Sequence, residues 1–151
     1  MTDWQSSLDG ALDAFVRAAT LAGVRLSRDD LTVEFRPAPH HQPGSLPAGM
    51  MAVYGFWWDG AWLKIGKAGP KSGPRYVSHH YNLSAPSTLA KSLAADSAML
   101  AVPGFDPAAP GVWMRRATCR VNILLPASQD PKLLSFLEAF LHLRLQPRYE
   151  G

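Results

Sequence analysis

The chain has a single cysteine and no long apolar run, and both absences narrow what it can be. Cys119 cannot form a disulfide within the chain, which is typical of proteins in a reducing compartment. No apolar run approaches the length of a bilayer-spanning helix, and the polar, acidic N-terminus does not resemble a secretory signal. The sequence therefore predicts a cytoplasmic protein that does not engage a membrane.

Several catalytic signatures are also missing. The sequence shows no glycine-rich phosphate loop, no serine–histidine–aspartate set, no paired carboxylates and no internal repeats. His79 and His80 are adjacent, but no cysteine or further acidic cluster accompanies them to complete a zinc site. Cys119 lacks the surroundings of a nucleophile, and we expect it to be a small core residue on a strand.

Charge is plentiful but unevenly distributed along the chain. The net charge is +3, yet residues 1–59 hold four basic and seven acidic side chains, whereas residues 60–129 hold eight basic and two acidic ones. Trp62, Tyr76 and Tyr81 lie within this basic stretch. Basic residues interleaved with aromatic ones are typical of a surface that binds nucleic acid, although an ordinary basic surface gives the same pattern.

The patterning predicts an N-terminal extension in front of one compact domain. Thr2 and Gln5 form a capping box, and apolar residues then repeat at helical spacing until Gly23. Residues 31–36 alternate like a short strand. The next thirteen residues hold four prolines, two glycines and a His-His pair at positions 40 and 41, which predicts a linker or an extended surface loop. We therefore expect residues 1–49 to be a helical extension with a proline-rich linker, and residues 50–151 to be the main domain.

Residues 50–66 predict a β-hairpin, and the length of its loop decides which side chains share a face. Two strong strand patterns lie on either side of an Asp-Gly turn. A two-residue loop pairs Tyr54 with Ile65 and sends Lys64 to the other face. A three-residue loop that ends in a left-handed Gly60 pairs Tyr54 directly with Lys64. The sequence allows both loops, and only the second brings the phenol and the ammonium group together.

The rest of the chain is predicted to form short helices over residues 75–81 and 84–99, a loop over 101–111, a strand over 112–125, and a final helix that Asp130-Pro131 opens and Pro147 ends.

Glu138 lies at the edge of the broad apolar stripe of this final helix. A carboxylate there is partly desolvated and suits a cation or a metal ion. The alternative is a border glutamate that reaches water or pairs with His142.

Three further residues have side chains suited to phosphate chemistry. Arg75 and His79 are four residues apart, so on a helix they share a face, where a guanidinium can hold a phosphate and an imidazole can relay a proton. Tyr54 can act as a base only without its proton, against a reference pKa of about 10, and neighbouring lysines favour the phenolate. Each residue alone also has an ordinary explanation, such as a buried tyrosine or a solvated surface cation.

Taken together, the order and spacing of these residues resemble the GIY-YIG nuclease domain over about residues 50–151. Ala52-Val53-Tyr54 stands where that family has its first tripeptide. Lys64-Ile65-Gly66, ten residues later, stands at the second. Lys64 replaces the tyrosine of the second tripeptide, as it does in some restriction enzymes and phage-related members of the family.

The later part of the chain extends this resemblance. Residues 73–82 resemble the family's helix, with its arginine at Arg75 and a histidine at His79. The last helix is similar to the family's final helix, whose glutamate falls on Glu138. Pro147-Arg148-Tyr149 resembles a sequence in the incision subunit of bacterial nucleotide excision repair, where an asparagine stands at the position of Glu150.

The resemblance implies an α+β fold with a small three-stranded, mainly antiparallel sheet flanked by helices. It also implies a metal-dependent endonuclease that hydrolyses phosphodiester bonds in DNA, with RNA as the alternative substrate. Tyr54 would stand at the general-base position, Arg75 would stabilise charge on the phosphate, and Glu138 would hold Mg²⁺ or Mn²⁺. His79 and Lys64 would assist in positioning or proton transfer. The expected nucleic-acid contacts are Lys67, Lys71, His80, Lys91, Arg116, Arg120 and Arg148.

The alternative interpretation is a catalytically inactive module of the same fold that binds nucleic acid or a protein partner. The two interpretations differ in geometry. An enzyme requires five side chains to converge on one open basic cleft: Tyr54, Lys64, Arg75, His79 and Glu138. Homo-oligomerisation is left open, because a single site cuts one strand per visit.

Overall fold

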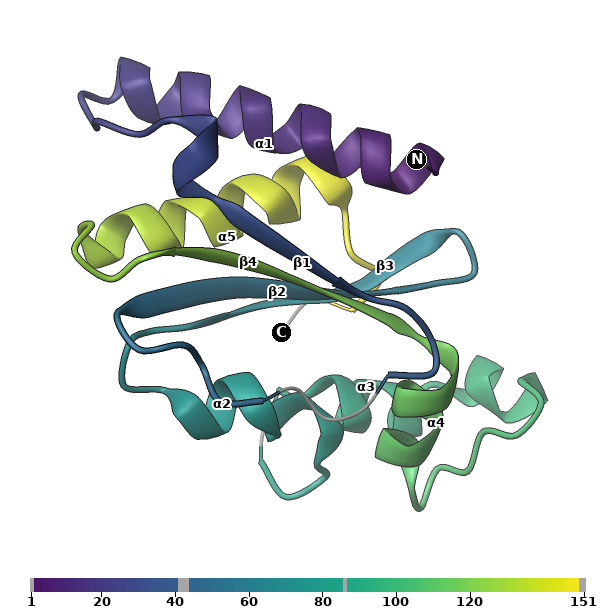
Figure 1. Cartoon of the computed structure of the whole chain (residues 1–151). Coiled ribbons are helices and arrows are strands. Elements are labelled where there is room, and N and C mark those ends of the chain that lie inside the picture. Colours follow the sequence, from purple (N-terminus) through teal and green to yellow (C-terminus); the bar gives the residue numbers. More distant parts are fainter. Residues whose placement is uncertain (1, 41–43, 86, 150–151) are drawn as a thin grey trace.

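The structure, a computed structural model, describes residues 2–40, 44–85 and 87–149. It has three layers, with a twisted antiparallel sheet between two sets of helices (Figure 1). The four strands lie in the order β1 (Thr32–Arg36), β4 (Cys119–Pro126), β2 (Met50–Trp58) and β3 (Ala61–Ala68). None of the helices within the described ranges is both long and apolar enough to cross a membrane.

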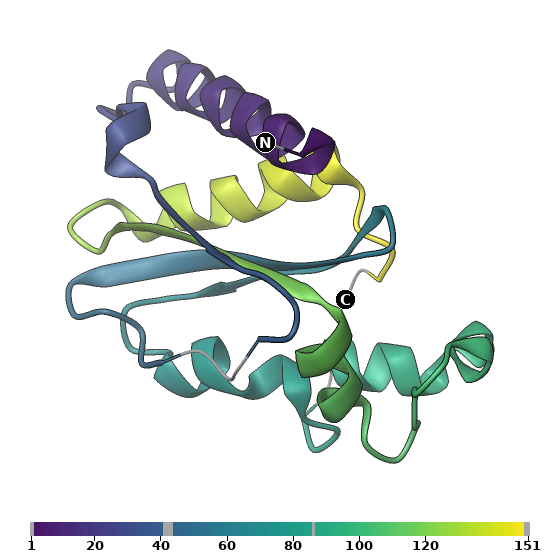
Figure 2. The ribbon, with the colours of Figure 1, turned by 45° about the vertical axis from the view of Figure 1, so that its right-hand side comes forward.

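The helices divide between the two faces of the sheet, and we name the faces after them. The α1/α5 face is covered by α1 (Asp3–Leu21) and α5 (Pro131–Leu145). The α2–α4 face is covered by α2 (Gly73–Val77), α3 (Leu89–Ala95) and α4 (Pro110–Ala117). The rotated view in Figure 2 shows the same division.

α1 forms as the sequence predicts. The Thr2 hydroxyl accepts a hydrogen bond from the Gln5 backbone N–H, and the Gln5 side chain accepts one from the Thr2 N–H at 2.9 Å. Leu8, Leu12 and Phe15 are buried on one side of the helix. The helix ends two residues before Gly23, whose positive φ of 87° is a conformation that favours glycine.

The N-terminal segment belongs to the same sheet as the rest of the chain. β1 pairs antiparallel with β4, with Val33 opposite Ile123 and Phe35 opposite Val121. The fold is therefore α+β with a four-stranded antiparallel sheet, one strand more than the resemblance implied. Local alternation predicted the strand correctly, but it carries no information about a pairing partner so distant in the sequence.

The β2–β3 hairpin has the two-residue turn, followed by an irregularity. Asp59 and Gly60 both have positive φ values, 48° and 79°, and Trp58 lies opposite Ala61. Beyond the pair Trp57–Trp62 the register shifts by one residue. The shift is a β-bulge that places one extra residue in β3.

This bulge decides where Lys64 points. Phe56 lies opposite Lys64 and Tyr54 lies opposite Gly66, so neither of the two predicted pairings is correct. Because residues two apart on a strand share a face, Tyr54, Phe56 and Lys64 still point to the same side. That side is the α2–α4 face, which buries Tyr54 and Phe56.

The predicted strand over residues 112–125 begins too early. Its first part is the helix α4, which starts with Pro110 in the first turn and buries Trp113 and Met114. The Thr118 backbone N–H and hydroxyl both bond to the Met114 carbonyl and end the helix. Valine and tryptophan favour strands, but the N-terminal proline and the packing of α4 against the sheet override this preference.

The helices before α4 are shorter than predicted. α2 ends at Val77, and a separate 3₁₀ turn over His79–Tyr81 follows it. α3 begins at Leu89, where Thr88 accepts a hydrogen bond from the Lys91 N–H at 3.1 Å. The predicted start of this helix at residue 84 is wrong, because residues 84 and 85 are not helical; Pro86 lies outside the described residues. Leu89 and Leu93 are buried, as predicted.

α5 begins as predicted, with Asp130 accepting a hydrogen bond from the Lys132 N–H at 2.9 Å. It ends at Leu145, followed by a left-handed Gln146 and by Pro147. The tail then runs beside β3, because the Arg148 and Tyr149 N–H groups donate to the Trp62 and Leu63 carbonyls at 2.8 and 2.9 Å. The Tyr149 hydroxyl donates to Asp96 at 2.6 Å and fixes the tail to the α2–α4 layer.

Candidate active site

Four of the predicted side chains gather around β3, an outer strand of the sheet. Lys67 lies on β3 itself, and Tyr54 reaches over the strand from β2. Arg75 comes from α2 on one face, and Glu138 comes from α5 on the other. The tail covers β3 near Trp62 and Leu63, so these residues surround the part of the strand that the tail does not reach.

Glu138 pairs with a lysine across the edge of the sheet. The Lys67 ammonium lies 3.8 Å from a Glu138 carboxylate oxygen and donates a hydrogen bond to the Ser135 hydroxyl at 2.8 Å. The side chains of Lys67 and Glu138 are 37% and 24% exposed. A pair this accessible is weakly held, typically by less than about 1 kcal/mol, and an incoming cation or anion can exchange with either partner.

This contact revises the predicted partner of Glu138 and the predicted role of Lys67. The alternative prediction paired Glu138 with His142, but the His142 Nε2 lies 3.1 Å from the Ile65 carbonyl oxygen. Lys67 was predicted only as a nucleic-acid contact, and its position beside Glu138 was missed, as was Ser135. The signal for Ser135 was its spacing, because residues three apart on a helix lie on the same side.

Tyr54 is almost fully buried, and its hydroxyl points to the same edge. The hydroxyl donates a hydrogen bond to the Arg75 carbonyl oxygen at 3.2 Å. Burial raises the pKa of Tyr54 to about 12, against the opposing pull of the Arg120 and Arg75 guanidinium groups, while the Glu138 carboxylate raises the pKa further. The hydroxyl therefore lies within electrostatic reach of residues from both helical layers.

Gly66 allows the Tyr54 and His80 side chains to lie close to β3. A Cβ atom at this position would lie 3.1 Å from two carbons of the Tyr54 ring and 2.9 Å from His80 Nε2. Both distances are shorter than ordinary packing allows. The glycine therefore permits the phenol and the imidazole to approach the β3 backbone closely.

His80 is buried and is not a surface contact for nucleic acid, contrary to the prediction. Its Nδ1 accepts a hydrogen bond from the Leu89 N–H at 3.1 Å, so the neutral ring carries its proton on Nε2. Burial lowers the pKa of His80 to about 3, and nearby positive groups lower it further. The ring is therefore neutral near pH 7 and holds α3 against the sheet.

His79 and Lys64 lie closer to the interior than predicted. His79 follows the end of α2, so it does not share one continuous helix with Arg75. Burial lowers the pKa of His79, and the positive charges of Arg75 and Lys64 lower it further. Lys64 is only 4% exposed, on the side of β3 that faces α2.

Arg120 is also buried, at 1% exposure, and cannot contact nucleic acid as predicted. Its guanidinium donates to the Asn122 side chain at 2.8 Å and to the Tyr76 carbonyl at 2.7 Å. A weaker bond at 3.3 Å goes to the Tyr81 hydroxyl. The guanidinium carbon lies 4.5 Å from the centre of the Tyr54 ring. Arg120 therefore supports the phenol from inside the protein.

The other predicted nucleic-acid contacts are exposed. Lys71 lies in the turn between β3 and α2, and Arg148 lies on the tail beside β3, so both flank the candidate site. Lys91 is on α3. Arg116 is on α4 and donates to the Gly104 carbonyl at 2.8 Å. Glu150 and His41 lie outside the described residues.

The metal-binding capacity of the site is limited to one carboxylate. The described residues contain no group of three or more His, Cys, Asp or Glu side chains that could hold a metal ion. A single carboxylate suits Mg²⁺ or Mn²⁺ only when water and substrate phosphate supply the other ligands, which is a common arrangement for magnesium. Glu138, partly exposed beside Lys67, fits that arrangement.

The chain was also compared with known proteins. No family model, no curated protein and no solved structure matches it. Its function must therefore be inferred from the residues and geometry described above.

Proposed function

We propose that the chain is a metal-dependent endonuclease that hydrolyses phosphodiester bonds in DNA at the part of β3 that the tail leaves open. The observation that carries this proposal is the position of the Tyr54 hydroxyl. It bonds to the Arg75 backbone and its pKa responds to both the Arg75 guanidinium and the Glu138 carboxylate. A base candidate and a phosphate-binding cation therefore lie together on the α2–α4 side of β3, and the carboxylate approaches the same strand from the α1/α5 side through its contact with Lys67.

The cations of the site suit a phosphate. Arg75 is exposed on a short helix, and its guanidinium can hold two phosphoryl oxygens at once. Lys67 is held by Ser135 and Glu138 and is partly exposed. Lys71 and Arg148 extend the positive charge along both ends of the strand, where a nucleic-acid backbone can lie.

Glu138 would hold the metal ion. A bound magnesium ion supplies positive charge for the phosphoryl oxygens and lowers the pKa of a coordinated water. On binding such an ion, the Glu138 carboxylate would give up its contact with Lys67, and Lys67 would be available to the phosphate. The weak Lys67–Glu138 contact supports this exchange.

Tyr54 is protonated at neutral pH, because its pKa is about 12. Only its deprotonated fraction can accept a proton from water. That fraction rises about tenfold for each pH unit well below the pKa. We therefore expect the cleavage rate to increase with pH from about 6 to about 9 without a plateau, with a slope near one on logarithmic axes.

The proposal is tested by incubating supercoiled plasmid with the protein in Mg²⁺ or EDTA. Wild-type protein should nick the plasmid only with the metal, and Glu138→Gln and Tyr54→Phe should each reduce the rate by about 100-fold or more. Asp13→Asn is the matched control, because it removes an exposed carboxylate on α1. Equal cleavage by wild-type protein and Glu138→Gln would contradict the proposal.

The binding-only interpretation predicts a different result. In that case the protein retards DNA in a gel at low salt and releases it at high salt, without any metal-dependent cleavage. Arg75→Ala would then weaken retardation, and Tyr54→Phe would leave it unchanged. Retardation that is lost together with cleavage in Arg75→Ala supports the enzyme.

A further inference from the structure

The tail forms backbone hydrogen bonds to part of the outer edge of β3, whereas the outer edge of β1 has no such pairing within the described residues. β1 pairs with β4 on one side, and no strand in the described parts of the chain pairs with its other side. Natural proteins usually protect such edges with lysine, proline or a bulge. β1 has no lysine, proline or bulge between Thr32 and Arg36, but Pro37 follows it directly. Its two charged side chains, Glu34 and Arg36, lie 3.4 Å apart and are partly exposed.

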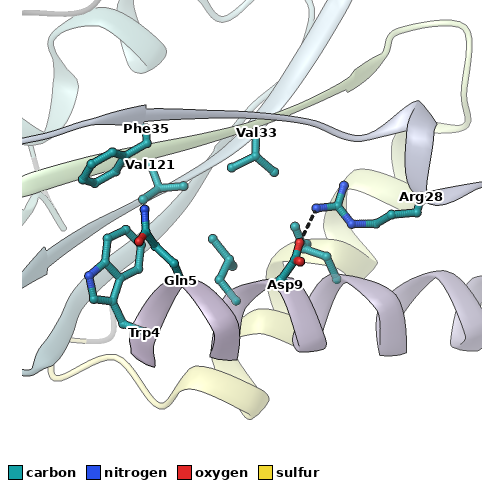
Figure 3. A pocket seen from close by; sticks show the side chains of 9 residues that line it. Trp4, Gln5, Asp9, Arg28, Val33, Phe35 and Val121 are labelled. Atoms are coloured by element: carbon teal, nitrogen blue, oxygen red, sulfur yellow. Dashed lines mark hydrogen bonds and ion pairs between the residues drawn. The ribbon is translucent and has the colours of Figure 1, made fainter. Parts of the chain in front are cut away.

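The side chains at this edge are apolar where they face the α1/α5 side. Val33 and Phe35 are 38% and 42% exposed. They lie beside a hollow of about 390 Å³ between β1 and α1, shown in Figure 3. The centroids of the Trp4 and Phe35 rings, which both line this hollow, lie 5.3 Å apart. Leu8, Leu12 and Val121 complete its apolar lining.

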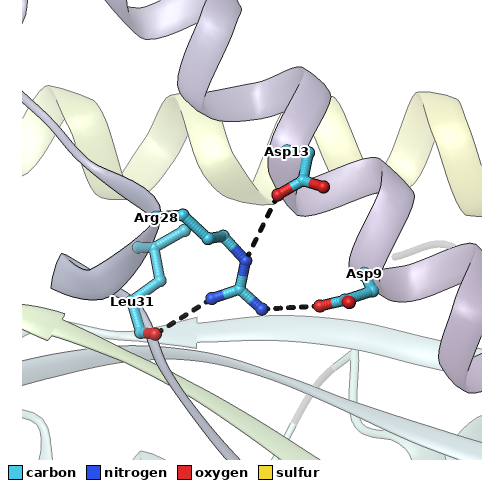
Figure 4. A network of polar contacts seen from close by, with 4 residues as sticks. All are labelled: Asp9, Asp13, Arg28 and Leu31. Carbon is cyan, nitrogen blue, oxygen red and sulfur yellow. Dashed lines mark hydrogen bonds and ion pairs between the residues drawn. The ribbon is translucent and has the colours of Figure 1, made fainter.

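The wall of the hollow is held in place by Arg28 (Figure 4). The Arg28 guanidinium contacts Asp9 at 2.8 Å and Asp13 at 3.7 Å, both on α1. It also donates to the Leu31 carbonyl at 3.1 Å, just before β1. α1 and the start of β1 are thus tied together, and the described residues leave Val33 and Phe35 partly exposed beside the hollow.

We propose that this edge is the interface of a homodimer, in which β1 pairs antiparallel with β1 of a second copy about a two-fold axis at Phe35. With the axis perpendicular to the sheet, residues that point to the same side pair with one another. This register places Phe35 opposite Phe35 and Glu34 opposite Arg36 of the other copy, in both directions. Registers centred on Glu34 or Arg36 would instead oppose like charges, which is destabilising.

The dimer joins the two sheets into one of eight strands. The two β3 edges then lie at its far ends, because β1 and β3 are at opposite edges of each sheet. Each candidate active site stays open and keeps all its residues from one chain. The proposal therefore does not depend on the proposed nuclease activity, and either can fail without the other.

The first test is the mass of the protein in solution. In this register, residues 34–36 of each strand pair with strand residues of the other copy, and Val33 faces Pro37. The interface is therefore small, so we expect a dissociation constant of about 10–100 μM. Sedimentation velocity from about 1 μM to about 1 mM should show the mass rise from 16.5 kDa to twice that value. A single 16.5 kDa species over the whole range would overturn the proposal.

A matched pair of variants locates the interface. Phe35→Lys should raise the dissociation constant at least about tenfold, because it places two ammonium groups opposite each other in an apolar contact. Leu143→Lys is the control, because Leu143 is 75% exposed on α5, away from β1. Circular dichroism checks that both variants are folded. A dimer that Phe35→Lys leaves intact would overturn the proposal.

Charge exchange tests the register. Glu34→Arg leaves two cations on this side of β1, and Arg36→Glu leaves two anions, so each variant alone should remain monomeric. Mixed in equal amounts, the two variants should form a heterodimer, because every cross-strand pair then joins opposite charges. Failure of the mixture to associate, while wild-type protein dimerises, would overturn the proposed register.

Discussion

The two faces of the sheet differ in the polarity of the side chains buried against them. On the α1/α5 face, the buried side chains of the core are hydrophobic, with Leu12, Phe15, Val53 and Leu137 among them. The α2–α4 face combines a hydrophobic core with buried polar groups. Those polar residues, all from the described part of the chain, are His40, Lys64, His80, Thr88, Thr118, Arg120 and Asn122.

The polar groups of the α2–α4 face form a connected network. His40 bonds to the Thr118 carbonyl at 2.7 Å and to the Tyr81 hydroxyl at 2.8 Å. Tyr81 in turn accepts a bond from Arg120, which also holds Asn122. Such a network is sensitive to geometry, because an unpaired polar group in the interior is costly. The comparison indicates that one face supplies bulk stability, while the other fixes the position of Tyr54.

The largest effect should come from the centre of the network. We expect Arg120→Ala to lower the free energy of unfolding by about 4 kcal/mol, because it leaves a cavity and removes a hydrogen bond from the Asn122 side chain and another from the Tyr76 carbonyl. The Tyr81 hydroxyl loses its weaker bond to Arg120 and keeps the one to His40. Urea unfolding at pH 7.5 measures the loss. A loss below about 1 kcal/mol would contradict the network's role.

Double-mutant cycles sharpen this prediction. Arg120→Ala and Tyr81→Phe should be coupled by at least about 1 kcal/mol, because the residues share a hydrogen bond. Arg120→Ala and Leu137→Ala lie on opposite faces of the sheet and should be additive within about 0.5 kcal/mol. Strong coupling in the second cycle would show that the two faces do not act separately.

The second effect is a loss of stability in acid that arises on the α2–α4 face. The pKa of His80 is lowered from 6.5 to about 3. Between these pH values, the imidazole is protonated in the unfolded chain and neutral in the folded protein. This contribution is complete above pH 6.5 and is lost as the pH falls towards 3. At pH 4 it should amount to about 3 kcal/mol relative to pH 7.5. Burial lowers the pKa of His40 in the same direction.

Variants on the two faces separate this effect from general destabilisation. His80→Asn keeps an acceptor for the Leu89 N–H but cannot take up the proton, so its unfolding free energy should fall less between pH 7.5 and pH 4. Leu137→Ala, on the α1/α5 face, should lower stability equally at both pH values. An unchanged pH dependence in His80→Asn would contradict the assignment.

The smallest effect compares one glycine from each side. Gly66→Ala should destabilise by about 2 kcal/mol, because the added methyl group meets His80 and the Tyr54 ring. Gly10→Ala should stabilise by about 0.5–1 kcal/mol, because Gly10 lies inside α1 with no other group within 4 Å of the new atom. Thermal unfolding measures both changes. A neutral Gly66→Ala would show that the imidazole and phenol can move aside.

Local signals in the sequence predicted the elements that depend on neighbouring residues. The Thr2–Gln5 capping box and the Asp130 cap both open helices where expected, because each is made within one turn of the chain. The hairpin was also predicted, since its Asp-Gly turn carries its own signal. The register beyond Trp57 was not, because a bulge depends on packing from both faces of the sheet.

Burial was harder to predict than secondary structure. Arg120 alternates correctly on β4, but its surroundings come from Tyr54, Tyr76 and Tyr81, which no local pattern connects to it. His80 was expected on the surface for the same reason. At the site, the sequence predicted Tyr54, Arg75 and Glu138 as members of one set, whereas the contact of Lys67 with Glu138 emerged only from the three-dimensional arrangement.

The strand order also constrains how a new chain can fold during synthesis. β4 is the last strand to be made, and it lies between β1 and β2. At ribosomal rates, on the order of 5–20 s pass between the synthesis of β1 and that of β4, its neighbour in the sheet. Until then β1 and the β2–β3 hairpin share no backbone pairing, so the four-stranded sheet forms late. A fragment that stops before Cys119 should therefore fail to yield a smaller folded unit.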